Sequence, residues 1–197
     1  MMKSERTNSP QSLKEHSKKW GREYKGNLAV NLGYSFHWHN RYDEIEKALF
    51  DMADNHCSFC DIRPLKASGA TIEHFRPKKT FPLLAYVWAN LFYACSNCQK
   101  KGKRFDPTCK PLKPDQFNYS FNYYFIFIET VEEILLKPNP ARSPEEQKRA
   151  DETIKLYGLN KFARPEARKA ELEDYREDVK LGKNKNKKYY SYRFILE

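Results

Sequence analysis

Two Cys-x-x-Cys pairs constrain the fold of this chain more than any other feature of its sequence. They stand at Cys57/Cys60 and Cys95/Cys98, with residues 61–94 between them. Each pair fits a zinc knuckle, a tight turn that directs two thiolates at one ion, and two knuckles complete a tetrahedral four-cysteine site. Such a closed site is structural, and its binding energy contributes to folding. A redox dithiol is the alternative, but neither pair has much of the strand–helix pattern around a thioredoxin-type motif.

Composition shifts divide the chain into four segments of one compact domain. The segment with the cysteine pairs is broken by prolines and glycines, and loop-rich structure of this kind needs a metal or another staple to be stable. The segments before and after it have the patterns of regular secondary structure. The expected segments are 1–56, a helical N-terminal segment; 57–112, the metal-binding core; 113–140, a β-hairpin; and 141–197, C-terminal helices with a basic tail.

Residue periodicity predicts the elements outside the core. Ile45, Leu49 and Met52 share one face of an amphipathic helix. Every odd position in 117–127 is aromatic, which favours a strand that continues as a hairpin and packs in the core; a base-stacking platform is the alternative. Ser143, followed by a proline and two acidic residues, indicates a helix start. The predicted helices are 11–24, 41–55, 144–157 and about 163–181, with a loop or extended piece at 33–40.

Positive charge is concentrated in the segment with the cysteines. The chain has 197 residues and a formal net charge of +10. Most of that excess lies in 57–112, and a local excess of this kind predicts a polyanionic partner, with nucleic acid first. No stretch reaches the roughly 18–20 apolar residues of a membrane span, and the first residues lack the apolar core of a signal peptide. We therefore expect a cytoplasmic protein without a membrane partner.

Residues between the two cysteine pairs point to chemistry on phosphate. Glu73 and His74 are adjacent, and successive side chains of an extended segment face opposite ways, so one could hold a divalent cation while the other activates water. Basic residues flank this pair and could contact phosphate oxygens. The flanking residues are Arg76, Lys78 and Lys79 on one side and Lys100, Lys101, Lys103 and Arg104 on the other. The combination predicts cleavage of a phosphodiester.

With these residues the chain resembles the HNH endonucleases, the zinc-stapled form of the ββα-metal nuclease fold. It is most similar to the HNH nucleases of Septu (PtuB-like) anti-phage systems, which also occur as effectors of some retrons. The resemblance rests on the cysteine pairs and on IEHFRPKK, YVWANLFYACSNC and KKGKRF, and it extends from Pro10 and Trp20 to Arg168. It implies an α+β fold in which a mainly helical domain surrounds the zinc-stapled ββα-metal core, with a short aromatic β-hairpin.

The resemblance also implies a role for each residue of the motif. His74 is the general base, and Asn90 braces the loop that orients it. Glu73 is a metal ligand where these enzymes usually have aspartate. Gln99 is the second metal ligand, a departure from the usual asparagine or histidine, and Asn97 is its possible substitute. The implied cofactors are a structural Zn²⁺ and a catalytic Mg²⁺ or Mn²⁺.

The activity implied by the resemblance is metal-dependent hydrolysis of DNA in anti-phage defence. The implied partners are DNA and an ATPase of the defence system, with a retron reverse transcriptase and its DNA/RNA product as a further possibility. Two alternatives remain open. One is a non-catalytic zinc-knuckle protein that binds nucleic acid, in which Gln99 marks a lost metal site. The other is an HNH enzyme that cleaves RNA at the same site.

Three further features are interpreted as structural. His37 and His39 flank Trp38, but no third metal ligand is evident beside them. Cys109 is left over after both knuckles are filled, and nothing marks it as an activated thiol. The lysine-rich run 183–188 is a solvated tail or loop, with contact to a DNA backbone as the alternative.

Overall fold

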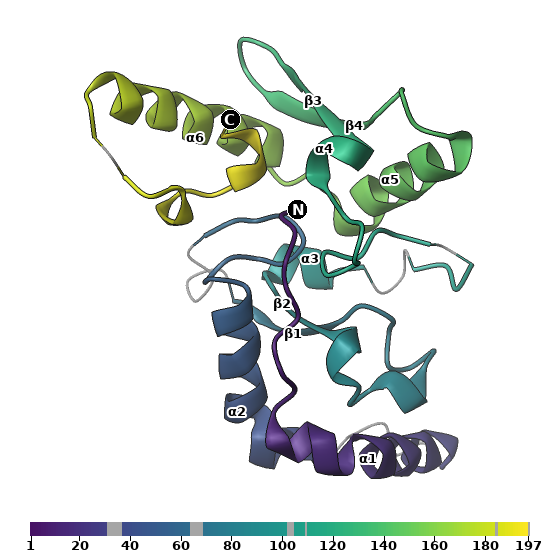
Figure 1. The fold of residues 1–197 in the computed structure, drawn as a ribbon. Helices are drawn as coiled ribbons and strands as arrows, with labels where there is room; N and C mark the ends of the chain where they lie inside the picture. Colours follow the sequence, from purple (N-terminus) through teal and green to yellow (C-terminus); the bar gives the residue numbers. More distant parts are fainter. Residues whose placement is uncertain (31–36, 64–68, 102–104, 109, 184, 197) are drawn as a thin grey trace.

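The computed structural model describes residues 1–30, 37–63, 69–101, 105–108, 110–183 and 185–196. Within these residues, six α-helices and two antiparallel sheets of two strands each form a mixed α+β fold (Figure 1). Lys103, Arg104 and Cys109, which the sequence analysis singles out, lie outside the described residues, as does the side chain of His39.

Two helices form the N-terminal part of the chain. Helix α1 covers Gln11–Ala29 and α2 covers His37–Met52. Helix α2 begins earlier than predicted, because the indole of Trp38 stacks on Tyr86 with ring centroids 5.0 Å apart and thereby anchors the first turn. The expectation of a loop or extended piece is therefore wrong for residues 37–40. The predicted apolar face is confirmed by Ile45 and Leu49, which are fully buried.

A short strand–strand–helix unit lies at the centre of the molecule (Figure 1). Strand β1, Thr71–His74, pairs with β2, Leu91–Ala94, in an antiparallel register that sets Glu73 opposite Phe92 and His74 opposite Leu91. Helix α3, Ser96–Gln99, follows β2 directly. All four residues of β2 are buried, so this strand is part of the core and holds the end of β1 in place.

The aromatic run corrects one prediction and confirms another. Residues 117–124 are not a strand: Tyr119 precedes a one-turn helix, α4, Phe121–Tyr124. The predicted hairpin begins only at β3, Phe125–Glu129, which pairs with β4, Ile134–Pro138. The rings pack in several directions, since Phe121 stacks on both Phe125 and Phe194. This packing buries Tyr119, Phe121 and Phe125, as expected, but Phe117 is 93% exposed and Tyr123 is 36% exposed.

The two C-terminal helices start and end where the sequence predicts. Helix α5 covers Pro144–Tyr157 and has a capping box, in which the Ser143 hydroxyl accepts from the Glu146 N–H and the Glu146 carboxylate accepts from the Ser143 N–H. It ends at Gly158, whose φ of 60° suits glycine. Helix α6 covers Arg164–Lys180. Local capping signals were sufficient for α5, whereas α6 has no side-chain cap at its start and has Pro165 in its first turn as a local signal.

One hydrophobic core joins all parts of the chain. Its buried side chains come from α1, α2, both sheets, α5, α6 and the last residues of the chain. The division into 1–56, 57–112, 113–140 and 141–197 stays a prediction, whereas the core itself is shared between those segments. None of the helices in the described ranges is both long and apolar enough to cross a bilayer.

Candidate metal centre and active site

The four cysteines of the two pairs come together in the core. Cys57, Cys60, Cys95 and Cys98 are buried and unbonded to one another, and their sulfurs all lie within 4.8 Å of one another. Cys60 Sγ is 3.7 Å from Cys95 Sγ. Tetrahedral zinc with Zn–S bonds of about 2.3 Å requires sulfurs about 3.8 Å apart, so this group fits a structural zinc ion. Within the described ranges it is the one group of three or more His, Cys, Asp or Glu residues arranged to hold a metal.

A buried arginine that the sequence analysis did not single out contacts two of these sulfurs. Arg164, the first residue of α6, directs its NH2 group to Cys98 Sγ at 3.2 Å and to Cys95 Sγ at 3.6 Å. Its NH1 group donates to the carbonyls of Tyr157 and Gly158 at the end of α5. Burial acts to lower the pKa of Arg164, but the negative charge of the four cysteines outweighs it and raises the pKa. Arg164 therefore compensates the negative charge of a four-thiolate site. It also connects the sulfurs to the turn between α5 and α6.

We expect Arg164→Met to weaken zinc binding by about tenfold or more, because a hydrogen bond to a charged group contributes about 1.5–3 kcal/mol. Arg168→Met is the matched control: Arg168 is also buried in α6, but its guanidinium donates to the carbonyls of Ile134 and Leu159. Competition against a chromogenic chelator measures zinc affinity in both variants. Equal losses of zinc affinity would show that Arg164 acts on stability alone.

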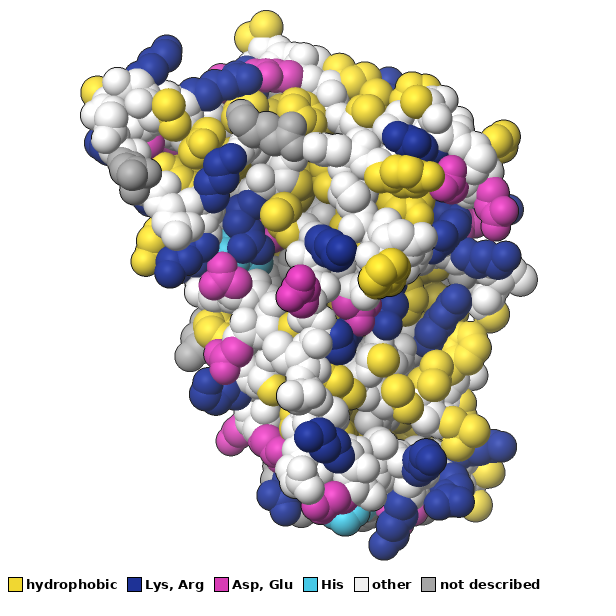
Figure 2. All heavy atoms as spheres, in the orientation of Figure 1, with side chains coloured by type: hydrophobic (Ala, Val, Ile, Leu, Met, Phe, Trp, Pro, Cys, Tyr) yellow, Lys and Arg dark blue, Asp and Glu magenta, His cyan; other side chains and the backbone are white. Residues whose placement is uncertain are grey.

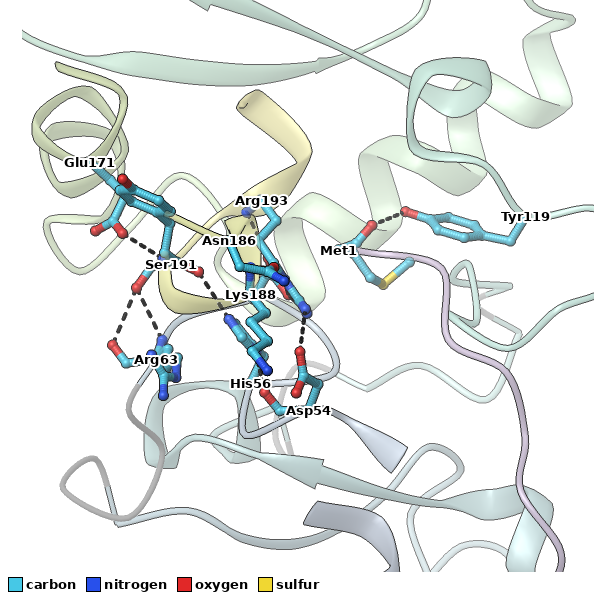
Figure 3. A network of polar contacts seen from close by, with 12 residues as sticks. Met1, Asp54, His56, Arg63, Tyr119, Glu171, Asn186, Lys188, Ser191 and Arg193 are labelled. Carbon is cyan, nitrogen blue, oxygen red and sulfur yellow. Dashed lines mark hydrogen bonds and ion pairs between the residues drawn. The ribbon is translucent and has the colours of Figure 1, made fainter. Parts of the chain in front are cut away.

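The C-terminal segment holds the first cysteine pair from the other side (Figure 3). Asp61, which follows Cys60, accepts from the Arg193 backbone N–H and from its guanidinium, both at 2.7 Å. His56 Nε2 lies 2.9 Å from the Tyr190 carbonyl oxygen, and the Ser191 hydroxyl accepts from the Arg63 N–H. Figure 3 shows Arg63 directed at Ser191 and Arg193 directed at Asp54, across the boundary between the two segments. Nothing in the sequence pattern signals these contacts, which join residues more than a hundred positions apart.

His74 ends β1 in a defined environment. Its Nε2 atom lies 2.9 Å from the carbonyl oxygen of Ala85, and its ring meets the Trp38 indole edge-on, with centroids 5.6 Å apart. A carbonyl can only accept, so Nε2 carries the proton and Nδ1 has the free lone pair. The pKa of His74 is lowered to about 4, mainly by burial; the hydrogen bond to Ala85 opposes this shift, and the charges of Lys78 and Lys101 add to it. The imidazole is therefore neutral at pH 7.

Asn90 fastens both ends of the loop that follows His74. Its Oδ1 accepts from the Arg76 N–H at 2.7 Å, and its Nδ2 donates to the carbonyls of Arg76 and Leu84 at 3.0 and 3.1 Å. The next residue after Leu84 is Ala85, which holds the imidazole of His74. A buried side-chain amide thus holds the backbone on both sides of the His74 imidazole, and the role of loop brace stays a prediction.

Glu73 has a buried lysine as its partner, and this corrects the expectation for Lys101. Lys101 is only 1% exposed, and its Nζ lies 2.5 Å from Glu73 Oε1. The ammonium also donates to the carbonyls of His74 and Phe75. Burial raises the pKa of Glu73, and the charge of Lys101 opposes that shift. Lys101 therefore faces the protein interior and binds β1, so it is not placed to contact a substrate phosphate.

The oxygen donors expected at the catalytic ion are few. The ion pair with Lys101 uses Oε1 of Glu73, which leaves Oε2 to contact an ion. The Gln99 side chain donates from Nε2 to the Ala94 carbonyl at 2.7 Å, so its Oε1 is the atom available as a ligand. Asn97 Oδ1 accepts from Lys100 Nζ at 3.3 Å. Mg²⁺ usually keeps several waters and takes only one or two protein carboxylates, and Glu73 is the one carboxylate of the expected set.

The three basic residues that follow His74 are Arg76, Lys78 and Lys79. The Arg76 guanidinium is within 6 Å of the ring centres of Phe75, Phe81 and Phe105. Lys78 Nζ lies 5.5 Å from the ring centre of Tyr24 in α1, and Lys79 is exposed. Burial lowers the pKa of Lys78, its neighbour Lys79 lowers it further, and Glu73 raises it. The positive charge that the sequence places before the second cysteine pair thus lies beside the loop that carries the site.

Comparison with known proteins finds similarity to a Septu protein. Over 130 residues the chain is 32% identical to the Septu protein PtuB of Bacillus thuringiensis. This chain is similar to a Septu protein. The aligned part is 62% of this chain and 48% of that protein, so the chain spans about half the length of the curated relative it matches. No protein-family model matches the chain.

Proposed function

We propose that this chain is a metal-dependent HNH endonuclease that hydrolyses DNA phosphodiester bonds in a Septu-like anti-phage defence system. The observation that carries the proposal is the imidazole of His74, whose Nε2 is fixed by Ala85 so that Nδ1 is left as a base. The strand–strand–helix order of β1, β2 and α3 beside the four-cysteine group supports the HNH assignment. The similarity to PtuB supports the defence role.

In the proposed reaction each residue has a distinct task. Nδ1 of His74 takes a proton from water, and the resulting hydroxide attacks phosphorus in line with the departing oxygen. Asn90 keeps the loop and therefore the imidazole in place. Arg76 and Lys78 neutralise the non-bridging phosphate oxygens. Mg²⁺ or Mn²⁺, held by Glu73 and Gln99, would stabilise the negative charge that develops on the phosphate.

The proposal extends to partners outside this chain. A nuclease would damage the DNA of its own host unless its activity were restrained. The similarity to a Septu protein supports a second component of the system that restrains the nuclease. We assign that role to a partner ATPase. If the chain belongs to a retron, the partners also include a reverse transcriptase and its DNA/RNA product. Co-purification of this chain with the product of the neighbouring gene tests the assignment directly.

One observation favours a second candidate, a zinc-knuckle protein that binds nucleic acid without cleaving it. The Glu73 carboxylate is paired with the Lys101 ammonium, which takes one of the oxygens that a divalent ion would use. Gln99 also differs from the asparagine or histidine that the resemblance leads one to expect. In such a protein the Lys101 ammonium permanently occupies the place of the divalent ion. The protein then binds DNA through its positive charge and does not cleave it.

Cleavage assays separate the candidates. Supercoiled plasmid DNA and a structured RNA are incubated with the protein in the presence and absence of Mg²⁺ or Mn²⁺. The ion is omitted after dialysis, because EDTA also competes for zinc, and the zinc content is measured before and after. Nicking or linearisation of DNA that requires the added ion is the expected result. Cleavage of RNA alone would transfer the activity to RNA, and binding without cleavage of either substrate would favour the second candidate.

A further inference from the structure

One face of α1 carries four cations that lie outside the candidate active site. Lys14, Lys18, Arg22 and Lys25, hereafter the basic stripe, follow one another at spacings of four, four and three residues. At about 100° per residue they fall within an arc of about 80° on the helix surface. All four are exposed. These four cations lie outside residues 57–112, where most of the excess positive charge is found.

The charge of the basic stripe is not compensated within the described residues, where none of its members forms an ion pair. The acidic residues of α1 are engaged elsewhere. Glu15 accepts a hydrogen bond from Gln11, and Glu23 lies 2.6 Å from His37 Nε2. Neighbouring like charges three or four residues apart destabilise a helix. A bound polyanion would relieve this repulsion.

The basic stripe has the dimensions of a contact to a nucleic-acid backbone. Eleven residues separate its ends, which is about 16 Å along the helix axis. DNA presents one phosphate of each strand about every 3.4 Å along the duplex axis, so the length of the stripe corresponds to about five base pairs. Lysine and arginine on a rigid helix supply the non-specific, salt-sensitive part of DNA binding.

Helix α1 is fixed to the loop that holds His74. Gly21 packs directly on the 3-10 turn Pro82–Leu84: a Cβ at this position would lie 3.0 Å from the Leu83 carbonyl oxygen. The Trp20 ring meets Tyr86 edge-on at 5.4 Å between centroids. Between these two contacts lies Ala85, the partner of the His74 imidazole. The basic stripe therefore has a fixed position relative to the active site.

The surface view agrees with this placement. Figure 2 shows lysine and arginine side chains gathered along the lower edge of the molecule, where Figure 1 places α1. Exposed Lys79 belongs to the loop against which α1 packs, so positive charge continues from the helix toward the site.

We propose that the basic stripe is a docking surface for the phosphate backbone of duplex DNA and leads that backbone past Lys79 to His74. The inference rests on the proposed function for the identity of the substrate and names the helix that holds it. Docking does not depend on cleavage, so the two can be tested apart.

The test replaces all four residues of the basic stripe by glutamine, which keeps helix propensity and removes charge. The control carries four glutamines at exposed lysines outside α1: Lys137, Lys148, Lys161 and Lys180. Binding of a short mixed-sequence DNA duplex is followed by fluorescence anisotropy without divalent ion, at several salt concentrations. Thermal unfolding of both variants checks that they fold.

We expect the stripe variant to bind duplex DNA about tenfold or more weaker at low salt, and its plot of log K against log salt to lose about three to four units of slope. The control should lose about one unit or less. Equal slopes for the stripe variant and the wild type, or equal losses in both variants, would overturn the docking surface. Slope lost only in the stripe variant, with no cleavage by the wild type under any divalent ion, would leave docking standing and remove the proposed nuclease function.

Discussion

His74→Ala should abolish cleavage while the protein stays folded and retains its zinc. Loss of a positioned general base costs about a hundredfold to ten-thousandfold in rate. The structural cost is small by comparison, because the hydrogen bond to Ala85 contributes about 1 kcal/mol and the edge contact with Trp38 about 0.5–1.5 kcal/mol. Plasmid cleavage gives the rate, and thermal unfolding and metal analysis report on the fold.

Two further variants make this prediction specific to the basic nitrogen. His74→Gln keeps an amide N–H that can donate to Ala85 but offers no base, so it should be as inactive as the alanine variant. His16→Ala removes an exposed histidine of α1 and should cleave like the wild type. Wild-type cleavage by either His74 variant would refute the assignment of His74 as general base.

Local signals in the sequence were sufficient to predict those elements whose structure depends on residues close together in the sequence. Helix α5 is the clearest case, because Ser143, Glu146 and Gly158 cap both of its ends through contacts within a few positions. The cysteine pairs are similar: the spacing within each pair sets a turn, and the chemistry of metal ligation predicts that the two turns meet. The cluster of four sulfurs in the core follows that logic.

Contacts between distant segments account for the errors. Alternating aromatic residues predicted a strand over 117–127, but Phe121 turns toward Phe194 from the end of the chain, and a helical turn forms there instead. Residues 37–40 join α2 because Trp38 stacks on Tyr86. In both cases tertiary packing of rings decides the backbone conformation, and a short window of sequence does not contain that information.

The same distinction applies to the candidate site. Glu73, His74 and Asn90 were identified from a motif; Glu73 and His74 lie at the end of β1, and Asn90 directly precedes β2. Lys101 was grouped with surface cations because its neighbours are basic, yet it points inward and pairs with Glu73. Arg164 was overlooked, because its contacts to Cys95 and Cys98 span more than sixty residues. Only the packing of α6 on the cluster reveals it.

Cys95→Ser should remove the metal and unfold the protein. Apparent zinc-binding free energies of about 10–16 kcal/mol in four-ligand peptide sites equal or exceed the whole stability of a typical domain, about 5–15 kcal/mol. Cys95 follows β2 directly and precedes α3, so its loss releases both elements from the cluster. Metal analysis should find one zinc ion per chain in the wild type and far less in the variant. Cys109→Ser, outside the two pairs, should leave the zinc content unchanged.

Removing zinc from the wild type tests the same dependence without a mutation. A strong chelator should lower the thermal midpoint or unfold the protein at room temperature, and added Zn²⁺ should restore the fold as followed by circular dichroism. Retention of the full wild-type midpoint after complete zinc removal would contradict a structural role for the cluster. Cleavage should disappear with the fold in this experiment, whereas in His74→Ala it should disappear while the fold remains. Only a metal that stabilises the site and an imidazole that performs the chemistry give both results.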